Sequence, residues 1–276
     1  MSTEYENTLF SMAGKVVVIV GGLGQIGINT VAIMLEAGAK VAVVDIISRQ
    51  DYDLPESMAG YSDKKMLAFF KTDITNESQV RRAAELVVRL FGSIDVLINH
   101  GHYKGDPLQL RPHSPFFAPV EDYPFEIWKE TIDVNLNGLF LVSKIFGKLM
   151  VEQKRGVIIN TSSTYGIVSA RQTIYGDSGI NSPISYAATK AAILNFSRYL
   201  ATHWAGYNIR VNTISPGGVR NANQSDEFVE KYSDMTPLNR MAAPTEYQGA
   251  LLFLASDASS YMTGANLVVD GGWTAW

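Results

Sequence analysis

The sequence predicts an α/β fold in which helices cover both faces of a doubly wound parallel sheet. Two observations lead to this prediction. Short runs of β-branched and other apolar residues recur along the 276-residue chain, and segments with helical periodicity separate them. A glycine-rich turn, Val-Gly-Gly-Leu-Gly-Gln-Ile-Gly at 20–27, directly follows the first run. Such alternation favours three layers in a single domain, with ligands at the carboxyl ends of the strands.

Each expected element rests on a local pattern. The runs of buried type predict strands at 15–20, 40–45, 67–70, 94–98, 157–160, 209–214 and 266–269. The helical patterns predict helices over 28–38, 76–91, 124–152, a segment from before Tyr186 to about 205, and 244–255. Gly38 is expected to end the first helix. The stretch from 218 to 243 has no clear period and is expected to be irregular.

We expect one catalytic domain over 13–276, preceded by an N-terminal arm at 1–12. No linker rich in Pro, Gly or Ser and no change of composition divides the chain. Three segments at the expected ligand-binding edge are candidates to contact a substrate: the loops 102–120 and 164–185, and a lid at about 217–240.

Composition excludes several classes of function. The chain has no cysteine, which excludes disulfides, thiolate nucleophiles and cysteine metal sites, and its four histidines lack metal-ligand spacing, so no metal is expected. A formal charge of −4 without a long basic cluster argues against nucleic acid as a partner. We find no signal peptide and no apolar run of about 18 residues, so a cytoplasmic protein without a membrane partner is expected.

The first strand, turn, helix and second strand have the spacing of a dinucleotide-binding (Rossmann) unit. Gly21 and Gly27 allow a tight turn and a close approach of helix to sheet. The helix N-terminus offers free amides to a pyrophosphate. Asp45, at the end of the second strand, is positioned to accept hydrogen bonds from the adenosine ribose, and its charge would repel a 2′-phosphate.

Tyr186 and Lys190, in Tyr-Ala-Ala-Thr-Lys, are four residues apart and therefore share one helix face. An ammonium beside the phenol favours the ionised phenol. A tyrosine that exchanges its proton near neutral pH is a general acid/base.

The chain resembles the classical short-chain dehydrogenase/reductase family over about residues 13–272. The resemblance rests on motifs in the family's order: the glycine turn 21–27, Asp73-Ile74, Asn99, Val134-Asn135, Ser162-Ser163, Tyr186-x-x-x-Lys190, Pro216-Gly217-Gly218 and Asp270-Gly271-Gly272.

The resemblance implies hydride transfer between a secondary alcohol or ketone and a nicotinamide dinucleotide. It implies that Tyr186 is the acid/base and that Lys190 lowers its pKa and binds the nicotinamide ribose. Ser163 would hold the substrate oxygen, and Asn135 would support a water through its backbone. The implied cofactor contacts are Gly21, Leu23, Gly24, Gln25, Ile26, Gly27, Asp45, Asp73, Ile74, Asn99, Tyr186, Lys190, Pro216, Gly217 and Val219. The family also implies a homodimer or homotetramer.

The chain departs from the family at two motifs. Val20 replaces the usual threonine and Gln25 the middle glycine of the turn, while the usual Asn-Asn-Ala-Gly reads Asn99-His100-Gly101-His102. The change in the second motif leaves open what the residues at its end, Gly101 and His102, contact. The acidic Asp45 favours NAD over NADP, although Arg49 is close enough in sequence to keep NADP open.

Twenty-two residues lie between Ser163 and Tyr186, more than the family usually has. The substrate candidates in the three variable segments are His102, Tyr165, Arg171 and Arg220. Their polar character favours a hydroxyl-rich substrate, such as a sugar, sugar phosphate or nucleotide sugar. The insertion and residues 253–262 also resemble a subgroup linked to flagellin modification and nonulosonic-acid sugars.

Two alternatives stay open. One is an NADPH-dependent 3-oxoacyl or small-ketone reductase, because the same fold serves many substrates. The other is a non-catalytic dinucleotide-binding sensor, which the joint presence of Asn135, Ser163, Tyr186 and Lys190 disfavours.

Overall fold

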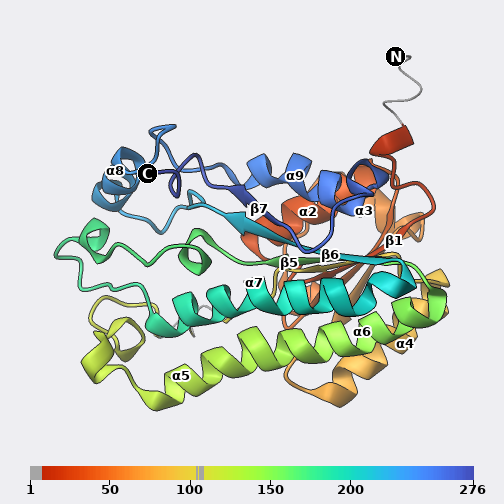
Figure 1. The fold of residues 1–276 in the computed structure, drawn as a ribbon, viewed down its shortest axis with the longest axis horizontal. Helices are drawn as coiled ribbons and strands as arrows, with labels where there is room; N and C mark the ends of the chain where they lie inside the picture. The colour runs from red at the N-terminus through yellow and green to blue at the C-terminus, as the bar shows by residue number, and fades with distance from the viewer. Residues whose placement is uncertain (1–7, 104, 106–108) are drawn as a thin grey trace.

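The computed structural model describes residues 8–103, 105 and 109–276 and has the predicted three-layer α/β architecture (Figure 1). Seven parallel strands pair in the order β3-β2-β1-β4-β5-β6-β7. The strands are β1 (Val16–Val20), β2 (Lys40–Asp45), β3 (Leu67–Lys71), β4 (Val96–Asn99), β5 (Gly156–Thr161), β6 (Ile209–Pro216) and β7 (Asn266–Val269). The helices are α2 (Gln25–Glu36), α3 (Glu56–Asp63), α4 (Glu77–Phe91), α5 (Phe125–Ile132), α6 (Leu139–Gln153), α7 (Ile184–Trp204), α8 (Asp226–Asp234) and α9 (Gln248–Ala255).

Strand β1 shows why the sheet is covered on both faces. Its side chains alternate between two cores, as the pleat requires. Val17 and Ile19 face a core shared with α2, α3 and α9, whereas Val16 and Val18 face a core shared with α4, α6 and α7. Figure 1 shows these two sets of helices on opposite sides of the sheet.

The strand order reverses between β1 and β4, because the chain runs outward to β3 and then returns to the other side of β1. In open parallel sheets, this reversal leaves a crevice at the carboxyl ends of the strands. The loops after β1, β4, β5 and β6 all leave the sheet at this edge, and they carry the glycine turn, Ser162-Ser163 and Gly217-Gly218.

The expected helix at 124–152 is one continuous helix with a π-helical turn, Asp133–Gly138, between α5 and α6. Asn135 lies in this turn and is buried. By length and composition the helix Phe125–Gln153 could cross a membrane, with a mean hydropathy of 1.3 in its most apolar window. Half of that window is buried, and the helix packs against α4, α7 and β5, as a core helix does.

Boundaries differ from the expectations mostly by one to three residues. Helix α2 begins at Gln25 rather than 28, because Gly24 forms its N-cap, and Gly38 follows it with a φ of +94°. Two helices were missed. Helix α3 buries only Met58, and α8 lies in the stretch expected to be irregular, although Ser225, Asp226 and Glu227 are typical of a helix N-terminus. Residues 1–7 of the expected arm and 104 and 106–108 of the loop 102–120 lie outside the described residues.

The contact between α6 and α7 depends on a glycine. A Cβ at Gly147 would lie 2.4 Å from the Trp204 ring. We expect Gly147→Ala to lower the free energy of unfolding by about 1–3 kcal/mol, because the tryptophan must move in a packed core. Urea unfolding measures this change.

The control is Gly249→Ala in α9, where a Cβ would meet nothing within 4 Å. This substitution should stabilise the protein by up to about 1 kcal/mol through helix propensity. Equal effects at both glycines would contradict the packing argument.

Candidate active site

The glycine turn after β1 is built for a close approach of backbone. Gly21 has a φ of +70°, and a Cβ there would lie 2.7 Å from the amide nitrogen of Gly101. A Cβ at Gly27 would lie 2.2 Å from the carbonyl oxygen of Gly21, so α2 can approach the turn only with glycine at this position. The first amides of α2, from Gln25 onward, have no acceptor within the helix. The turn therefore fits the pyrophosphate of a dinucleotide.

Asp45 ends β2 beside this turn and is buried. Its carboxylate accepts hydrogen bonds from the amides of Leu23, at 3.0 Å, and Ile47, at 3.1 Å. Two more lone pairs point away from these amides, as a ribose diol requires. Arg49 turns elsewhere: its guanidinium donates to the Tyr52 carbonyl at 2.8 Å and lies 5.6 Å from the centre of the Phe69 ring.

Three predicted catalytic residues come together at the end of β5. The Ser163 hydroxyl is hydrogen-bonded to the Tyr186 phenol. Lys190 follows one helical turn later on α7, with its Nζ 5.6 Å from the centre of the Tyr186 ring. The Lys190 ammonium donates to the Thr161 carbonyl at 2.8 Å. One strand end and one helix therefore place all three groups.

Burial controls the titration of this group. It lowers the pKa of Lys190 to about 7, and it raises the pKa of Tyr186 above its usual value. The hydrogen bond from Ser163 acts against this increase. The loss of water around the phenol outweighs the opposing hydrogen bond, so the pKa of Tyr186 is raised on balance, and the implied effect of Lys190 on this pKa stays a prediction.

Asn135 connects the π-helical turn to the site. Its amide donates to the Thr189 hydroxyl at 3.0 Å, and its Oδ1 accepts from the amide of Tyr103 at 2.6 Å. Single π turns interrupt helices often at functional sites. The side chain thus ties α7 to the loop after β4, while its backbone role toward a water stays a prediction.

His100, one of the departures from the family, is buried and joins three elements. Its Nε2 lies 3.0 Å from the Thr30 hydroxyl, and its Nδ1 lies 2.8 Å from the Thr161 hydroxyl. The Thr30 hydroxyl already donates to the Ile26 carbonyl, so it must accept from Nε2, and Nδ1 must accept from Thr161. Burial, Lys190 and His102 lower the pKa of His100 to about 3, which keeps it neutral. A neutral histidine thus fixes the strand end that holds Lys190.

Two of the four substrate candidates lie near Tyr186. The His102 ring is edge-on to Tyr186, with centroids 6.1 Å apart, and its Nδ1 lies 3.1 Å from the His100 carbonyl oxygen. Tyr165 is hydrogen-bonded to Tyr175, and the proximity of Tyr175 raises the pKa of Tyr186. These two rings and the phenol of Tyr175 form one side of the candidate substrate site.

The other two candidates lie on exposed positions away from these groups. Arg171 contacts Thr173 at 3.3 Å, and Arg220 contacts Asp226 at 3.4 Å. The two arginines therefore carry no argument for a phosphate next to Tyr186.

The insertion and the lid meet through aromatic side chains. Tyr175 stacks on Phe228 at 5.3 Å, and Tyr232 stacks on Trp273 at 4.2 Å. The Tyr232 hydroxyl also accepts from the amide of Gly218 at 2.6 Å. The same segments that looked polar in the sequence thus share an apolar cluster, with their charged side chains outside it. Trp273 belongs to this cluster, whereas Trp276 is exposed.

The remaining predicted cofactor contacts also lie at the carboxyl edge. Ile74 packs between Gly101 and Gly138, where a Cβ at Gly138 would meet it at 2.7 Å, and Asp73 precedes it. Asn99 donates to Asn160 across β4 and β5 at 2.7 Å. Past Pro216, the Gly217 amide donates to the Val269 carbonyl at 2.9 Å, and Val219 pairs with Ala242.

Sequence reasoning missed two residues that shape the site. Thr161 acts through its carbonyl oxygen, which no side-chain pattern reveals. Tyr232 lies on α8, the helix that the irregular assignment overlooked.

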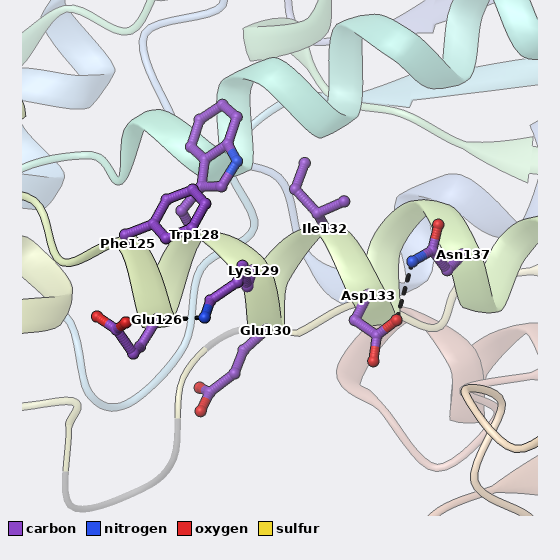
Figure 2. Close-up of a pocket in the computed structure, with 8 residues that line it drawn as sticks. All are labelled: Phe125, Glu126, Trp128, Lys129, Glu130, Ile132, Asp133 and Asn137. Atoms are coloured by element: carbon purple, nitrogen blue, oxygen red, sulfur yellow. Dashed lines mark hydrogen bonds and ion pairs between the residues drawn. The ribbon is translucent and has the colours of Figure 1, made fainter.

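A second concave surface lies on the outer side of α5 (Figure 2). The eight residues labelled there surround a volume of about 590 Å³. An ion pair joins Lys129 to Glu126 at 3.7 Å, and Asn137 donates to Asp133 at 2.9 Å. No catalytic residue lines this surface.

The fold and the site define a nicotinamide-dependent oxidoreductase of the short-chain dehydrogenase/reductase family, and comparison with known proteins shows that the chain belongs to this family. Residues 23–274 match the family model described as enoyl-(acyl carrier protein) reductase. D-Threitol dehydrogenase from Mycolicibacterium smegmatis is 31% identical over 96% of this chain and 95% of its own. The 3-oxoacyl-(acyl-carrier-protein) reductase FabG from Thermotoga maritima is 34% identical over 95% of this chain and 98% of its own.

A solved structure agrees with this membership. A short-chain dehydrogenase from Leptospira borgpetersenii with bound NAD⁺ is 36% identical and superposes with a TM-score of 0.83, covering 99% of this chain and 96% of its own. The names of other relatives include both NAD-dependent and NADP-dependent enzymes. Membership of the family therefore implies a nicotinamide dinucleotide cofactor, and relatives use either its NAD or its NADP form.

Stability should depend on pH through Lys190. Its pKa of about 7 in the folded protein is below the usual 10.5, so between these values the unfolded chain binds a proton that the folded chain does not. The free energy of unfolding should therefore rise with pH across this window. Urea midpoints of the cofactor-free protein at pH 7 and pH 9.5 measure the slope, which Lys190→Met should flatten.

Lys148→Met is the matched control, because the Lys148 side chain is 75% exposed and should not contribute to the slope. A wild-type slope that survives in Lys190→Met would contradict the lowered pKa of Lys190.

Proposed function

We propose that the protein is an NAD(H)-dependent oxidoreductase that interconverts a secondary alcohol and a ketone on a polar, carbohydrate-type substrate. The observation that carries the proposal is the Ser163, Tyr186 and Lys190 arrangement at the end of β5. The hydroxyls of Ser163 and Tyr186 form a hydrogen-bonded pair that can bind the substrate oxygen. The buried amine of Lys190 lies next to Tyr186.

The chemistry follows from this geometry. In oxidation, the substrate hydroxyl lies against Ser163 and passes its proton to the Tyr186 oxygen, while the hydrogen of the carbinol carbon departs as hydride. A nicotinamide dinucleotide held at this site would supply the hydride acceptor for oxidation and the hydride donor for reduction. Lys190, fixed by the Thr161 carbonyl, stabilises the phenolate that forms when Tyr186 gives up its proton. In the cofactor-free protein the raised pKa of Tyr186 favours the protonated phenol, which is the form that donates a proton in reduction.

The preference for NAD rests on Asp45. Its carboxylate is buried beside the turn, and the guanidinium of Arg49 is engaged by Tyr52 and Phe69 rather than held toward the carboxylate. A 2′-phosphate placed on the adenosine ribose would meet an acidic group, and like charges in contact cost several kcal/mol.

The substrate class rests on the relatives as well as on the site. Names among them include D-threitol, glycerol and galactitol dehydrogenases, which supports a polyol or sugar, with Tyr165, Tyr175 and His102 offering polar atoms beside Tyr186. The FabG relative supports the second candidate, an NADPH-dependent 3-oxoacyl reductase, against which Asp45 counts. Sugars of the nonulosonic type remain a prediction within the first class, and a non-catalytic sensor is the least favoured reading.

We further propose a cytoplasmic homodimer or homotetramer. Phe125 on α5, Phe140 on α6 and Tyr199 on α7 are more than half exposed, and Phe125 also lines the concave surface of Figure 2. A second subunit on these helices would cover them.

Tyr186→Phe tests the proposed mechanism. Turnover should fall by about 10²–10⁴-fold, because the general acid/base is lost. The assay follows NADH at 340 nm with a panel of polyols, sugars and sugar phosphates, beside a 3-oxoacyl thioester with NADPH. In the wild type, oxidation should accelerate with rising pH and reduction should slow, since the two directions need opposite states of the phenol.

NADH binding by fluorescence is the control, and it should be nearly unchanged in Tyr186→Phe. A variant that keeps a tenth or more of the activity would refute Tyr186 as acid/base. Turnover of only the thioester with NADPH would favour the second candidate.

Asp45→Asn tests the cofactor preference. The ratio of kcat/KM for NAD⁺ over NADP⁺ should fall by about tenfold or more, because the charge that repels the 2′-phosphate is gone. Asp51→Asn, an exposed carboxylate near Arg49, should leave the ratio unchanged. A wild type that prefers NADP⁺ would contradict the argument outright.

A further inference from the structure

Gln25 makes a contact that the mechanism does not use. This residue stands where the family has its middle glycine, at the first position of α2, and is exposed. Its side-chain Nε2 donates to the main-chain carbonyl of Arg220 at 2.7 Å, which joins residues 195 positions apart in the chain. A glycine could not make this contact.

The contact spans the cofactor crevice. Gln25 belongs to the turn after β1, and Arg220 follows the segment after β6. Two strands, β4 and β5, separate β1 from β6 in the sheet, so the strand ends lie roughly 14 Å apart at three inter-strand spacings. A dinucleotide that reaches from Asp45 past the glycine turn to the catalytic tyrosine must pass between these two segments.

Both ends of the contact are held in place. The amide of Arg220 donates to the Ala242 carbonyl at 2.9 Å, and the amide of Ala242 donates to the Gly218 carbonyl at 2.9 Å. On the other side, the Asn29 side chain donates to the Gln25 carbonyl at 2.9 Å. The hydrogen bond therefore joins two fixed pieces of backbone, not two mobile loops.

We propose that Gln25 acts as a clasp over the bound dinucleotide, so that the cofactor leaves only after the hydrogen bond between Gln25 and Arg220 opens. The clasp uses only the amide of Gln25 and a main-chain oxygen, so it is independent of the Arg220 side chain. It slows exchange of the whole dinucleotide and leaves its adenosine half unaffected, because Asp45 holds that half outside the clasp.

The experiment compares Gln25→Gly, the family's residue, and Gln25→Met, which keeps the length but has no donor. Stopped-flow fluorescence gives the rate constant of NADH dissociation, and a titration gives the affinity for AMP, which fills only the adenosine half. Both variants should release NADH about fivefold faster, the effect of one neutral hydrogen bond. Their affinity for AMP should change by less than about twofold.

The matched control is Gln248→Met. The Gln248 side chain, on α9, donates at 3.0 Å to the carbonyl of Asn29, which lies on α2 like Gln25. This hydrogen bond does not involve Arg220. It should leave NADH dissociation at the wild-type rate. A second readout needs no cofactor: amide hydrogen exchange at 218–224 should be faster in Gln25→Met than in the wild type.

Three results would overturn the clasp. The first is an unchanged rate of NADH dissociation in both Gln25 variants. The second is a loss of AMP affinity by the same factor as the increase in the NADH dissociation rate, because that would indicate a general loosening of α2. Gln248→Met could also accelerate release equally. If the wild type binds NADPH and not NADH, NADPH is the probe in the same comparison. A wild type that binds neither would refute the cofactor assignment together with the clasp.

Discussion

The site depends on one buried amine. Lys190 lies inside the protein with its ammonium on the Thr161 carbonyl, and this contact fixes where α7 meets β5. Tyr186 stands one helical turn before it on the same face, and Ser163 follows Thr161 by two residues. Burying an amine costs free energy unless its hydrogen bonds are satisfied. The end of β5 must therefore keep the Thr161 carbonyl in position to accept from Lys190. The neutral His100 does this, because it accepts from the Thr161 hydroxyl and donates to Thr30 on α2.

The same chain of contacts links cofactor and chemistry. Thr30 donates to the Ile26 carbonyl in the first turn of α2, the part of the helix that the family resemblance assigns to the pyrophosphate. From there, hydrogen bonds run through His100 and Thr161 to Lys190. His100 therefore stands where the family motif has its second asparagine, and its hydrogen bonds give it a structural role. His102, two residues on, instead lies against the catalytic ring.

Much of this arrangement could be predicted from the sequence, and the reasons differ by residue. β-branched runs and the glycine turn identify β1, α2 and β2, since local preference and burial agree there. The four-residue spacing of Tyr186 and Lys190 places them on one face of any helix. By contrast, Gln25 and Arg220, or Tyr175 and Phe228, have no sequence relation that would bring them together. The raised pKa of Tyr186 likewise has no counterpart in the sequence, because burial is a property of the packed site.

The sequence by itself thus determined the family and the order of the seven strands along the chain, and it singled out Tyr186 as the candidate acid/base, because these follow from local periodicity and spaced motifs. Only the tertiary structure decided which variable-segment residues face Tyr186, how the insertion and lid share an aromatic cluster, and where Gln25 reaches. Those features come from contacts between segments far apart in the chain. Their free energy depends on three-dimensional packing and desolvation, which no linear pattern records.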